Sequence, residues 1–151
     1  MKLIYLLSLL ITSSTVFACC AKQQEGTQEA IQNTDSMKLT ITVGQTVFTA
    51  TLYDNATVRA FKARLPMTVT MTELNGNEKY YDLPDNLPAN AINPGTIQTG
   101  DLMLYGSNTL VLFYTGFSTP YSYTRLGRID NPSGLAAALG RGSATVKFEL
   151  Q

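Results

Sequence analysis

The chain has 151 residues, with eleven basic and eleven acidic side chains and no net charge at neutral pH. It contains no histidine, no tryptophan and two cysteines, Cys19 and Cys20. These absences exclude a Ser-His-Asp triad and a histidine-ligated metal, and after residue 20 also a disulfide, a thiolate zinc site and a cysteine nucleophile. Lys and Arg are not clustered, so the sequence predicts no nucleic-acid binding. No cofactor, metal site or catalytic residue is predicted.

Residues 1–18 have the layout of a secretory signal peptide. Lys2 supplies a positive start, residues 3–11 are apolar apart from Ser8, and a small residue, Ala18, precedes Cys19. The apolar stretch is too short for a stable membrane-spanning helix. The sequence therefore predicts an exported protein that faces the periplasm or the cell surface.

The end of this segment, Val16-Phe17-Ala18-Cys19, is also similar to a bacterial lipobox. On that resemblance Cys19 carries a lipid, becomes the mature N-terminus and holds the protein at a membrane. Simple cleavage after Ala18 is the alternative, because a small residue at that position also suits ordinary signal peptidase. The fate of Cys20 is open.

Residues 19–36 are expected to form a flexible tether. The segment is rich in Gln, Glu, Thr and Asn, and its one large apolar side chain is Ile31. Such a composition buries too little apolar surface to offset the entropy lost on ordering. Residues 37–151 are then long enough for one domain with a core of its own.

From residue 37 the pattern alternates between apolar and polar residues with period two, which is typical of half-buried strands. Turn signals separate the segments: Gly44-Gln45, Asn75-Gly76 and Gly106-Ser107-Asn108. A continuous apolar run at 110–114 indicates a strand buried on both faces. Eight strands are predicted, at 39–43, 46–53, 67–74, 79–83, 102–105, 110–114, 121–129 and 144–150. Gly127 is a candidate for a bulge in the seventh.

Two short helices are predicted between the strands. The first covers residues 58–65, with Thr57 as N-cap and Pro66 at its end. The second covers 135–139 and ends at Gly140. Residues 85–100 are rich in Pro, Gly and Asn and are expected to form an irregular connection. Eight short strands with two helices predict a mainly β fold, a closed barrel with helices at its ends.

Several segments resemble the cyclophilin-like superfamily, in particular bacterial cyclophilin-like domains that are not established prolyl isomerases. The matching segments are 75–84 (NGNEKYYDLP), 100–106 (GDLMLYG), 110–114, 123–129 (YTRLGRI) and 133–135. The resemblance covers about residues 37–151. It implies an eight-stranded barrel capped by two short helices.

The resemblance implies the fold without the isomerase activity. Cyclophilins place a catalytic arginine on the strand that enters a proline turn, and the strand before Pro84 carries Asp82 there. Their histidine falls near Tyr123, and their groove tryptophan has no counterpart in a chain without Trp. A binding or scaffold module of unknown ligand is therefore expected, with a peptidyl-prolyl isomerase or another weak enzyme as the alternative.

If the barrel keeps the family's groove, Tyr81, Tyr105 and Arg125 are the predicted ligand-binding residues. They come from the strands matched to the groove-forming strands. Two aromatic faces and one planar cation suit a peptide or a small aromatic or anionic ligand. The competing interpretation is that the tyrosines pack on the barrel and that the arginine is a solvated surface charge.

Overall fold

The computed structural model describes residues 37–151. The predicted signal peptide at 1–18, the lipidation of Cys19, the fate of Cys20 and the tether at 19–36 lie outside the described residues. Within them, none of the helices is long and apolar enough to cross a membrane.

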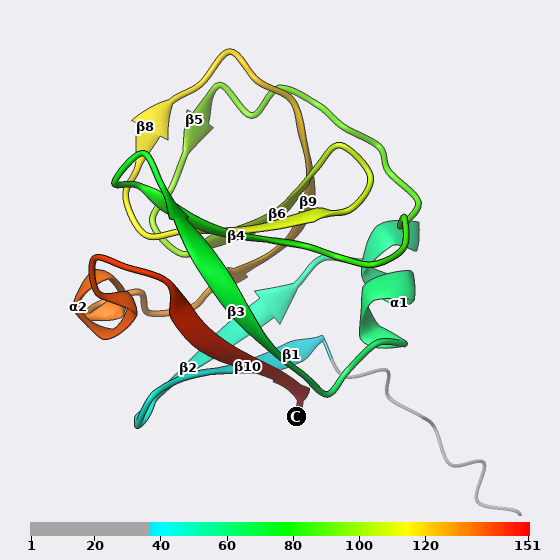
Figure 1. The fold of residues 1–151 in the computed structure, drawn as a ribbon. Helices are drawn as coiled ribbons and strands as arrows, with labels where there is room; N and C mark the ends of the chain where they lie inside the picture. Colours follow the sequence, from blue (N-terminus) through cyan, green and yellow to red (C-terminus); the bar gives the residue numbers. More distant parts are fainter. Residues whose placement is uncertain (1–36) are drawn as a thin grey trace, which may run out of the picture. The chain divides into compact units, whose positions relative to one another are not determined.

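The described chain forms a closed, eight-stranded antiparallel barrel with two short helices, as the sequence predicts (Figure 1). Around the barrel the strands follow the order β1-β10-β3-β4-β7-β6-β9-β2. Their bounds are β1 Lys38–Val43, β2 Thr46–Leu52, β3 Met67–Leu74, β4 Glu78–Asp82, β6 Asp101–Tyr105, β7 Thr109–Phe113, β9 Tyr123–Ile129 and β10 Ala144–Leu150.

Two further strands, β5 (Thr96–Ile97) and β8 (Phe117–Ser118), pair outside the barrel, above β6 and β9 in Figure 1. The sequence does not predict them, because two residues are too few for an alternating pattern. The predicted seventh strand also begins later than expected. It starts at Tyr123, and Tyr121 lies in a turn before it, where its backbone N–H donates to the Thr119 hydroxyl at 3.1 Å.

Helix α1 (Ala56–Lys62) begins and ends earlier than the predicted helix. Its N-cap is Asn55 and not Thr57, because the Asn55 side chain accepts from the backbone N–H of Val58 at 2.8 Å. Thr57 is buried, and its hydroxyl donates to the Pro88 carbonyl at 2.6 Å.

Residues 63–65 form a tighter turn after α1. The backbone N–H groups of Arg64 and Leu65 bond three residues back, at 3.0 and 3.1 Å, which is the pattern of a 3₁₀ turn. The residue before a proline disfavours the α conformation, so the regular helix stops short of Leu65.

Helix α2 (Leu135–Leu139) has the predicted bounds and ends at Gly140, whose φ of 63° suits glycine. Figure 1 shows the two helices on opposite sides of the barrel. Leu135 and Leu139 of α2 join the barrel core, as do Val58 and Phe61 of α1. The helices therefore cover the core where the strands leave it open.

The apolar side chains form two separate clusters, one inside the barrel and one outside. The larger is the barrel core, to which seven of the barrel strands contribute buried residues and β4 contributes the half-buried Tyr81. The smaller, here the outer cluster, consists of the buried residues Ile97, Met103, Val111, Phe113 and Tyr123, with Tyr80 and Phe117 packed against them. It lies on the outer face of β4, β7, β6 and β9, where β5 and β8 cover it.

Strand β7 contributes to both clusters, which confirms the predicted two-sided burial of the run 110–114 for residues 110–113. Tyr114, the last residue of the run, lies after β7 and is half-buried. Leu110 and Leu112 face the barrel core, and Val111 and Phe113 face the outer cluster. All four are at most 2% exposed. This two-sided burial is what allows a second apolar layer, and a pocket, on the outside of the barrel.

Strand β9 contains the predicted bulge. Gly127 pairs with Leu102 and Arg125 with Met103, so Leu126 is the extra residue of β9. The extra residue shifts the alternation of inward and outward side chains by one position. Arg125 and Arg128, which are three residues apart, are therefore both exposed. A Cβ at Gly127 would lie 2.6 Å from the Thr51 carbonyl oxygen. The bulge therefore needs glycine because of the neighbouring backbone.

We expect Gly127→Ala to lower the free energy of unfolding by about 1–3 kcal/mol, since the Thr51 backbone must move to admit the methyl group. Gly142→Ala is the matched control, because a Cβ there meets nothing within 4 Å. Its effect should stay within about 1 kcal/mol. Chemical denaturation of both variants measures the difference, and equal stabilities would contradict the role given to Gly127.

Candidate functional site

The described residues form a pocket on the outer face of the barrel, here called the outer pocket, with a volume of about 350 Å³. β4, β6, β7, β8 and β9 contribute to it, together with the hairpin between β3 and β4 and the turn before β9. Five aromatic side chains line it: Tyr80, Tyr105, Phe117, Tyr121 and Tyr123. Its acidic residues are Glu78 and Asp82.

The aromatic rings of the outer pocket contact one another in a chain. Tyr105 and Tyr123 are cross-strand partners, and their ring centroids lie 5.6 Å apart. Tyr121 meets Tyr105 edge-on at 6.2 Å. Tyr123 also meets Phe113 of the outer cluster edge-on at 5.5 Å. Because Tyr123 and Phe113 are buried, the wall of the pocket is anchored in packed structure.

The charged groups of the outer pocket are two carboxylates, Glu78 and Asp82. Glu78 is only 8% exposed, and its side chain has no hydrogen bond or ion pair with any residue of the described range. Asp82 accepts a hydrogen bond from the Thr109 hydroxyl at 2.6 Å. The side-chain oxygen of Asn77 is buried and has no donor among residues 37–151.

Burial raises the pKa of Glu78, and the carboxylate of Glu73 raises it further. A raised pKa means that the native state binds this proton more tightly than the unfolded chain does. The ionised form of Glu78 therefore costs stability at neutral pH, and the cost disappears as the pH falls below its pKa.

The structure does not bring the three predicted ligand residues together. Tyr105 lines the outer pocket. Tyr81 lies on the opposite face of β4, where it packs against the barrel core and lines a different hollow, and its neighbour Tyr80 faces the outer pocket instead. Arg125 is exposed on the outer face of β9 beside Met103 and is not a lining residue.

Arg125 lies near a separate group of charges around Asp101. Asp101 accepts from the backbone N–H of Gln98 at 2.8 Å, which fits the turn role expected for it at the entry to β6. Its carboxylate lies 3.5 Å from the Arg128 guanidinium. Burial raises the pKa of Asp101, although the Gln98 bond and the positive charges of Arg128 and Arg125 oppose that shift.

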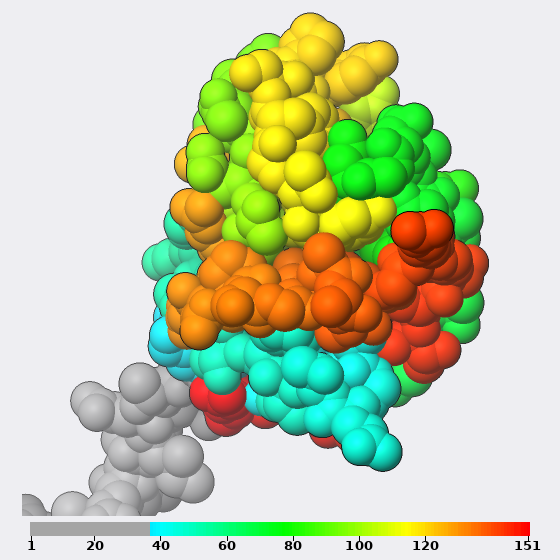
Figure 2. Space-filling model, turned by 90° about the vertical axis from the view of Figure 1, so that its left-hand side faces the viewer, coloured from blue at the N-terminus to red at the C-terminus, as the bar shows by residue number. Residues whose placement is uncertain are grey.

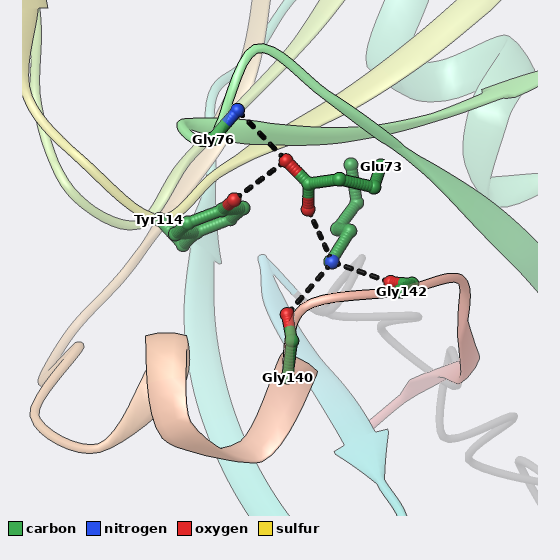
Figure 3. A network of polar contacts seen from close by, with 6 residues as sticks. Glu73, Gly76, Tyr114, Gly140 and Gly142 are labelled. Carbon is green, nitrogen blue, oxygen red and sulfur yellow. Dashed lines mark hydrogen bonds and ion pairs between the residues drawn. The ribbon is translucent and has the colours of Figure 1, made fainter.

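A second polar cluster lies on the inner side of β3 and β4, near α2 (Figure 3). The Lys79 side chain is fully buried and forms an ion pair with Glu73. Its ammonium also donates to the carbonyls of Gly140 and Gly142, at 2.9 and 2.6 Å. Lys79 therefore joins the β3–β4 hairpin to the loop after α2.

Glu73 completes this cluster by accepting from three donors. Besides Lys79, the Tyr114 hydroxyl donates at 2.7 Å and the backbone N–H of Gly76 at 2.9 Å (Figure 3). Burial by itself would raise the pKa of Glu73, but the hydrogen bonds outweigh it and hold the pKa below its usual value. Burial and the bond to Glu73 raise the pKa of Tyr114 to about 12. Every charge in this cluster is matched within the chain.

Figure 2 shows α2, in orange, lying across this face of the molecule between the cyan β1–β2 hairpin and the green and yellow residues. Lys79 is 0% exposed, and Glu73 and Tyr114 line a hollow beside α2. The polar groups of the cluster already bond to one another within the chain. We therefore regard it as a structural tie and the outer pocket as the candidate site. Within residues 37–151, no three Asp, Glu, His or Cys side chains are grouped so that they could hold a metal ion.

Comparison with known protein families identifies the family to which the chain belongs. The model of a family described as "Cyclophilin-like family" matches residues 41–149, most of the described range. This chain belongs to the cyclophilin-like family. The assignment confirms the resemblance read from the sequence.

A solved structure supports the fold of this cyclophilin-like domain. The solution structure of a hypothetical protein from Archaeoglobus fulgidus is similar to it, with a TM-score of 0.50 and 21% sequence identity. The match covers 77% of this chain and 95% of that one. At this identity the likeness concerns the fold alone. Comparison with curated proteins found no match.

The sequence analysis did not identify most of the residues that form the outer pocket and the Lys79–Glu73 cluster of the cyclophilin-like domain. One signal was present for the inner cluster. Asn75-Gly76 predicts a hairpin, and the register across it pairs Glu73 with Lys79 on one face. On a strand of period two, those residues fall on the same side as Tyr81, and Glu78 and Tyr80 fall on the other.

We expect Lys79→Met to lower the free energy of unfolding of this cyclophilin-like domain by about 3–5 kcal/mol. The substitution leaves the Glu73 carboxylate without its cation and two carbonyls without a donor. Lys147→Met is the matched control, since Lys147 is 47% exposed in its pair with Glu149. Its cost should be below about 1 kcal/mol. Similar denaturation midpoints for the two variants would show that Lys79 does not tie α2 to the barrel.

Proposed function

We propose that this protein is a ligand-binding module that takes a small molecule or a peptide side chain into its outer pocket. The observation that carries the proposal is the pocket itself, about 350 Å³ in volume and lined by five aromatic side chains. Ligand sites are typically apolar, aromatic hollows with a few placed polar groups. Tyr105 and Tyr121 are 45% and 58% exposed, so aromatic surface is available to a ligand.

The arrangement favours binding over prolyl isomerisation. Isomerisation of a prolyl amide crosses a barrier of about 18–20 kcal/mol and needs a positive group that polarises the amide. Asp82 stands where the family resemblance places the catalytic arginine, and it lines the outer pocket. A carboxylate opposes the charge that an arginine would stabilise. The chain also has neither histidine nor tryptophan.

The binding proposal predicts that Tyr105→Ala weakens ligand binding about tenfold, because Tyr105 contacts the rings of both Tyr121 and Tyr123. The measurement is ligand-observed NMR with a panel of aromatic small molecules and capped aromatic or proline-containing peptides. Tyr53→Ala is the control, as Tyr53 is similarly exposed and lies outside the outer pocket.

Two results would count against this proposal. Equal binding by the wild type and Tyr105→Ala would remove the outer pocket from consideration. Turnover of a proline-containing peptide well above the uncatalysed rate would instead support the isomerase alternative.

We further infer that the module is exported and held at a membrane by a lipid on Cys19. This inference rests on the lipobox-like residues 16–19 and the polar segment that follows them. A flexible tether of about 18 residues spans on the order of 20–25 Å, enough to hold the pocket clear of the lipid headgroups.

The lipid inference predicts a mature N-terminus at Cys19 with the mass of a lipid-modified cysteine. Mass spectrometry of the protein purified from membranes measures it, and Cys19→Ala should move the protein out of the membrane fraction. Cys20→Ala is the control and should leave the protein at the membrane. An unmodified N-terminus after cleavage at Ala18 would rule the lipid out.

A further inference from the structure

The outer pocket contains a carboxylate that no residue of the described range neutralises. Glu78 is 8% exposed and lines the pocket, and its side chain has no hydrogen bond or ion pair within residues 37–151. A buried charge is normally paired, because leaving it unpaired costs several kcal/mol. The charged group that shifts the pKa of Glu78 is the Glu73 carboxylate, which carries the same sign.

A second unsatisfied acceptor lies next to Glu78 in the chain. The buried side-chain oxygen of Asn77 finds no donor within residues 37–151, and Asn77 lines the same pocket. Buried polar atoms nearly always have a partner, so this oxygen is a second unpaired acceptor beside the Glu78 carboxylate. Unpaired acceptors at two neighbouring residues favour a ligand that carries N–H donors.

The remaining wall of the outer pocket suits a positive charge as well. Tyrosine rings attract cations through the negative potential of their faces, and four tyrosines line this pocket. Asp82 adds a second carboxylate. None of the Lys and Arg residues within 37–151 is among the lining residues, so no cation from that range occupies the pocket.

We propose that the outer pocket binds an organic cation, a protonated amine or a guanidinium on an apolar stem. The cationic head pairs with the Glu78 carboxylate beside Asn77, and the stem packs among the tyrosines. This inference rests on the proposed binding function and names its ligand class. Such a head occurs on free amines and on Lys or Arg side chains of a peptide.

The electrostatics of Glu78 agree with this assignment. Its raised pKa reflects the cost of burying the carboxylate beside Glu73, and a bound cation would relieve that cost. An anionic ligand would meet two carboxylates and no cation in the same space. The pocket therefore selects by charge as well as by shape.

Three ligands with one aromatic stem test the charge preference directly: phenethylammonium, the neutral 2-phenylethanol and the anionic phenylacetate. The purified protein is titrated with each at pH 7.5, and the backbone amide shifts of residues 75–82 are followed by NMR. We expect phenethylammonium to bind at least tenfold more tightly than 2-phenylethanol, and phenylacetate to bind most weakly.

The variant Glu78→Gln keeps the shape of the side chain and removes its charge. It should bring phenethylammonium and 2-phenylethanol to within about twofold of each other. Glu149→Gln is the control, an exposed carboxylate outside the pocket, and should keep the wild-type preference. Tyr121→Leu provides a second probe if Glu78→Gln fails to fold, since Tyr121 is 58% exposed. It should weaken the amine more than the alcohol, because it removes a cation–π contact.

Two results would overturn the inference, and they are distinguishable. If the neutral or anionic compound binds as well as the amine at residues 75–82, the pocket is a binding site without a cation preference. The proposed function would survive that result. If none of the three compounds shifts these amides, and the peptide and aromatic panel also fails, the binding function falls as well.

A pair of capped tripeptides then separates the two sources of the cation. Acetyl-Gly-Lys-Gly-amide carries the ammonium, and acetyl-Gly-norleucine-Gly-amide has nearly the same stem without it. Tighter binding of the lysine peptide than of phenethylammonium indicates a peptide partner, and the reverse indicates a free amine. Either order supports the cation site, whereas preference for the norleucine peptide over the lysine peptide contradicts it.

Discussion

The outer pocket depends on one constraint, the burial of β7 on both faces. Val111 and Phe113 point away from the barrel core, and an apolar face left in water would cost about 25 cal/mol per Å². The chain covers this face with β5 and β8, which come from its two long connections. The cover is small, so the pocket remains open beside it, with Phe117 of β8 and Leu74 of the hairpin both among the lining residues.

Near α2 the barrel is stabilised by a different interaction, the buried Lys79 ammonium with its partners. α2 is five residues long and has no side-chain hydrogen bond at its N-terminus, so it adds little stability by itself. Leu135 and Leu139 hold it by packing into the core, and Lys79 holds the loop behind it by bonding two carbonyls. Burying an ammonium is unfavourable, but Glu73 and the carbonyls together match its three donors.

The sequence predicted the position of strands that face water on one side and the core on the other, and of the strand that is buried on both faces. Alternation located the eight barrel strands, and the apolar run at 110–114 indicated the two-sided burial that residues 110–113 show. The bulge at Gly127 was predictable because a glycine interrupts an otherwise alternating strand. The helix N-cap was missed because Asn55 and Thr57 are both good caps, and only the tertiary contact of Thr57 with Pro88 decides between them.

The site was harder to predict because it depends on which face of a strand each residue occupies. Tyr80 and Tyr81 are adjacent, and the phase of β4 alone determines that Tyr80 reaches the outer pocket. That phase follows from Lys79, whose side chain must lie inside to meet Glu73. Tyr121 lies in a turn and could not be placed by alternation at all.

The β3–β4 hairpin carries two carboxylates, one that is paired within the chain and one whose side chain has no partner among the described residues. Glu73 faces inward, and Lys79, Tyr114 and the Gly76 backbone satisfy it completely. Glu78 faces outward into the pocket, is 8% exposed, and its side chain has no partner in the described chain. A glutamine there would keep the packing without the burial cost of a charge. The chain already shows, at Glu73, how it matches a charge that serves only structure. The unmatched charge at Glu78 therefore argues for a partner that comes from outside the chain.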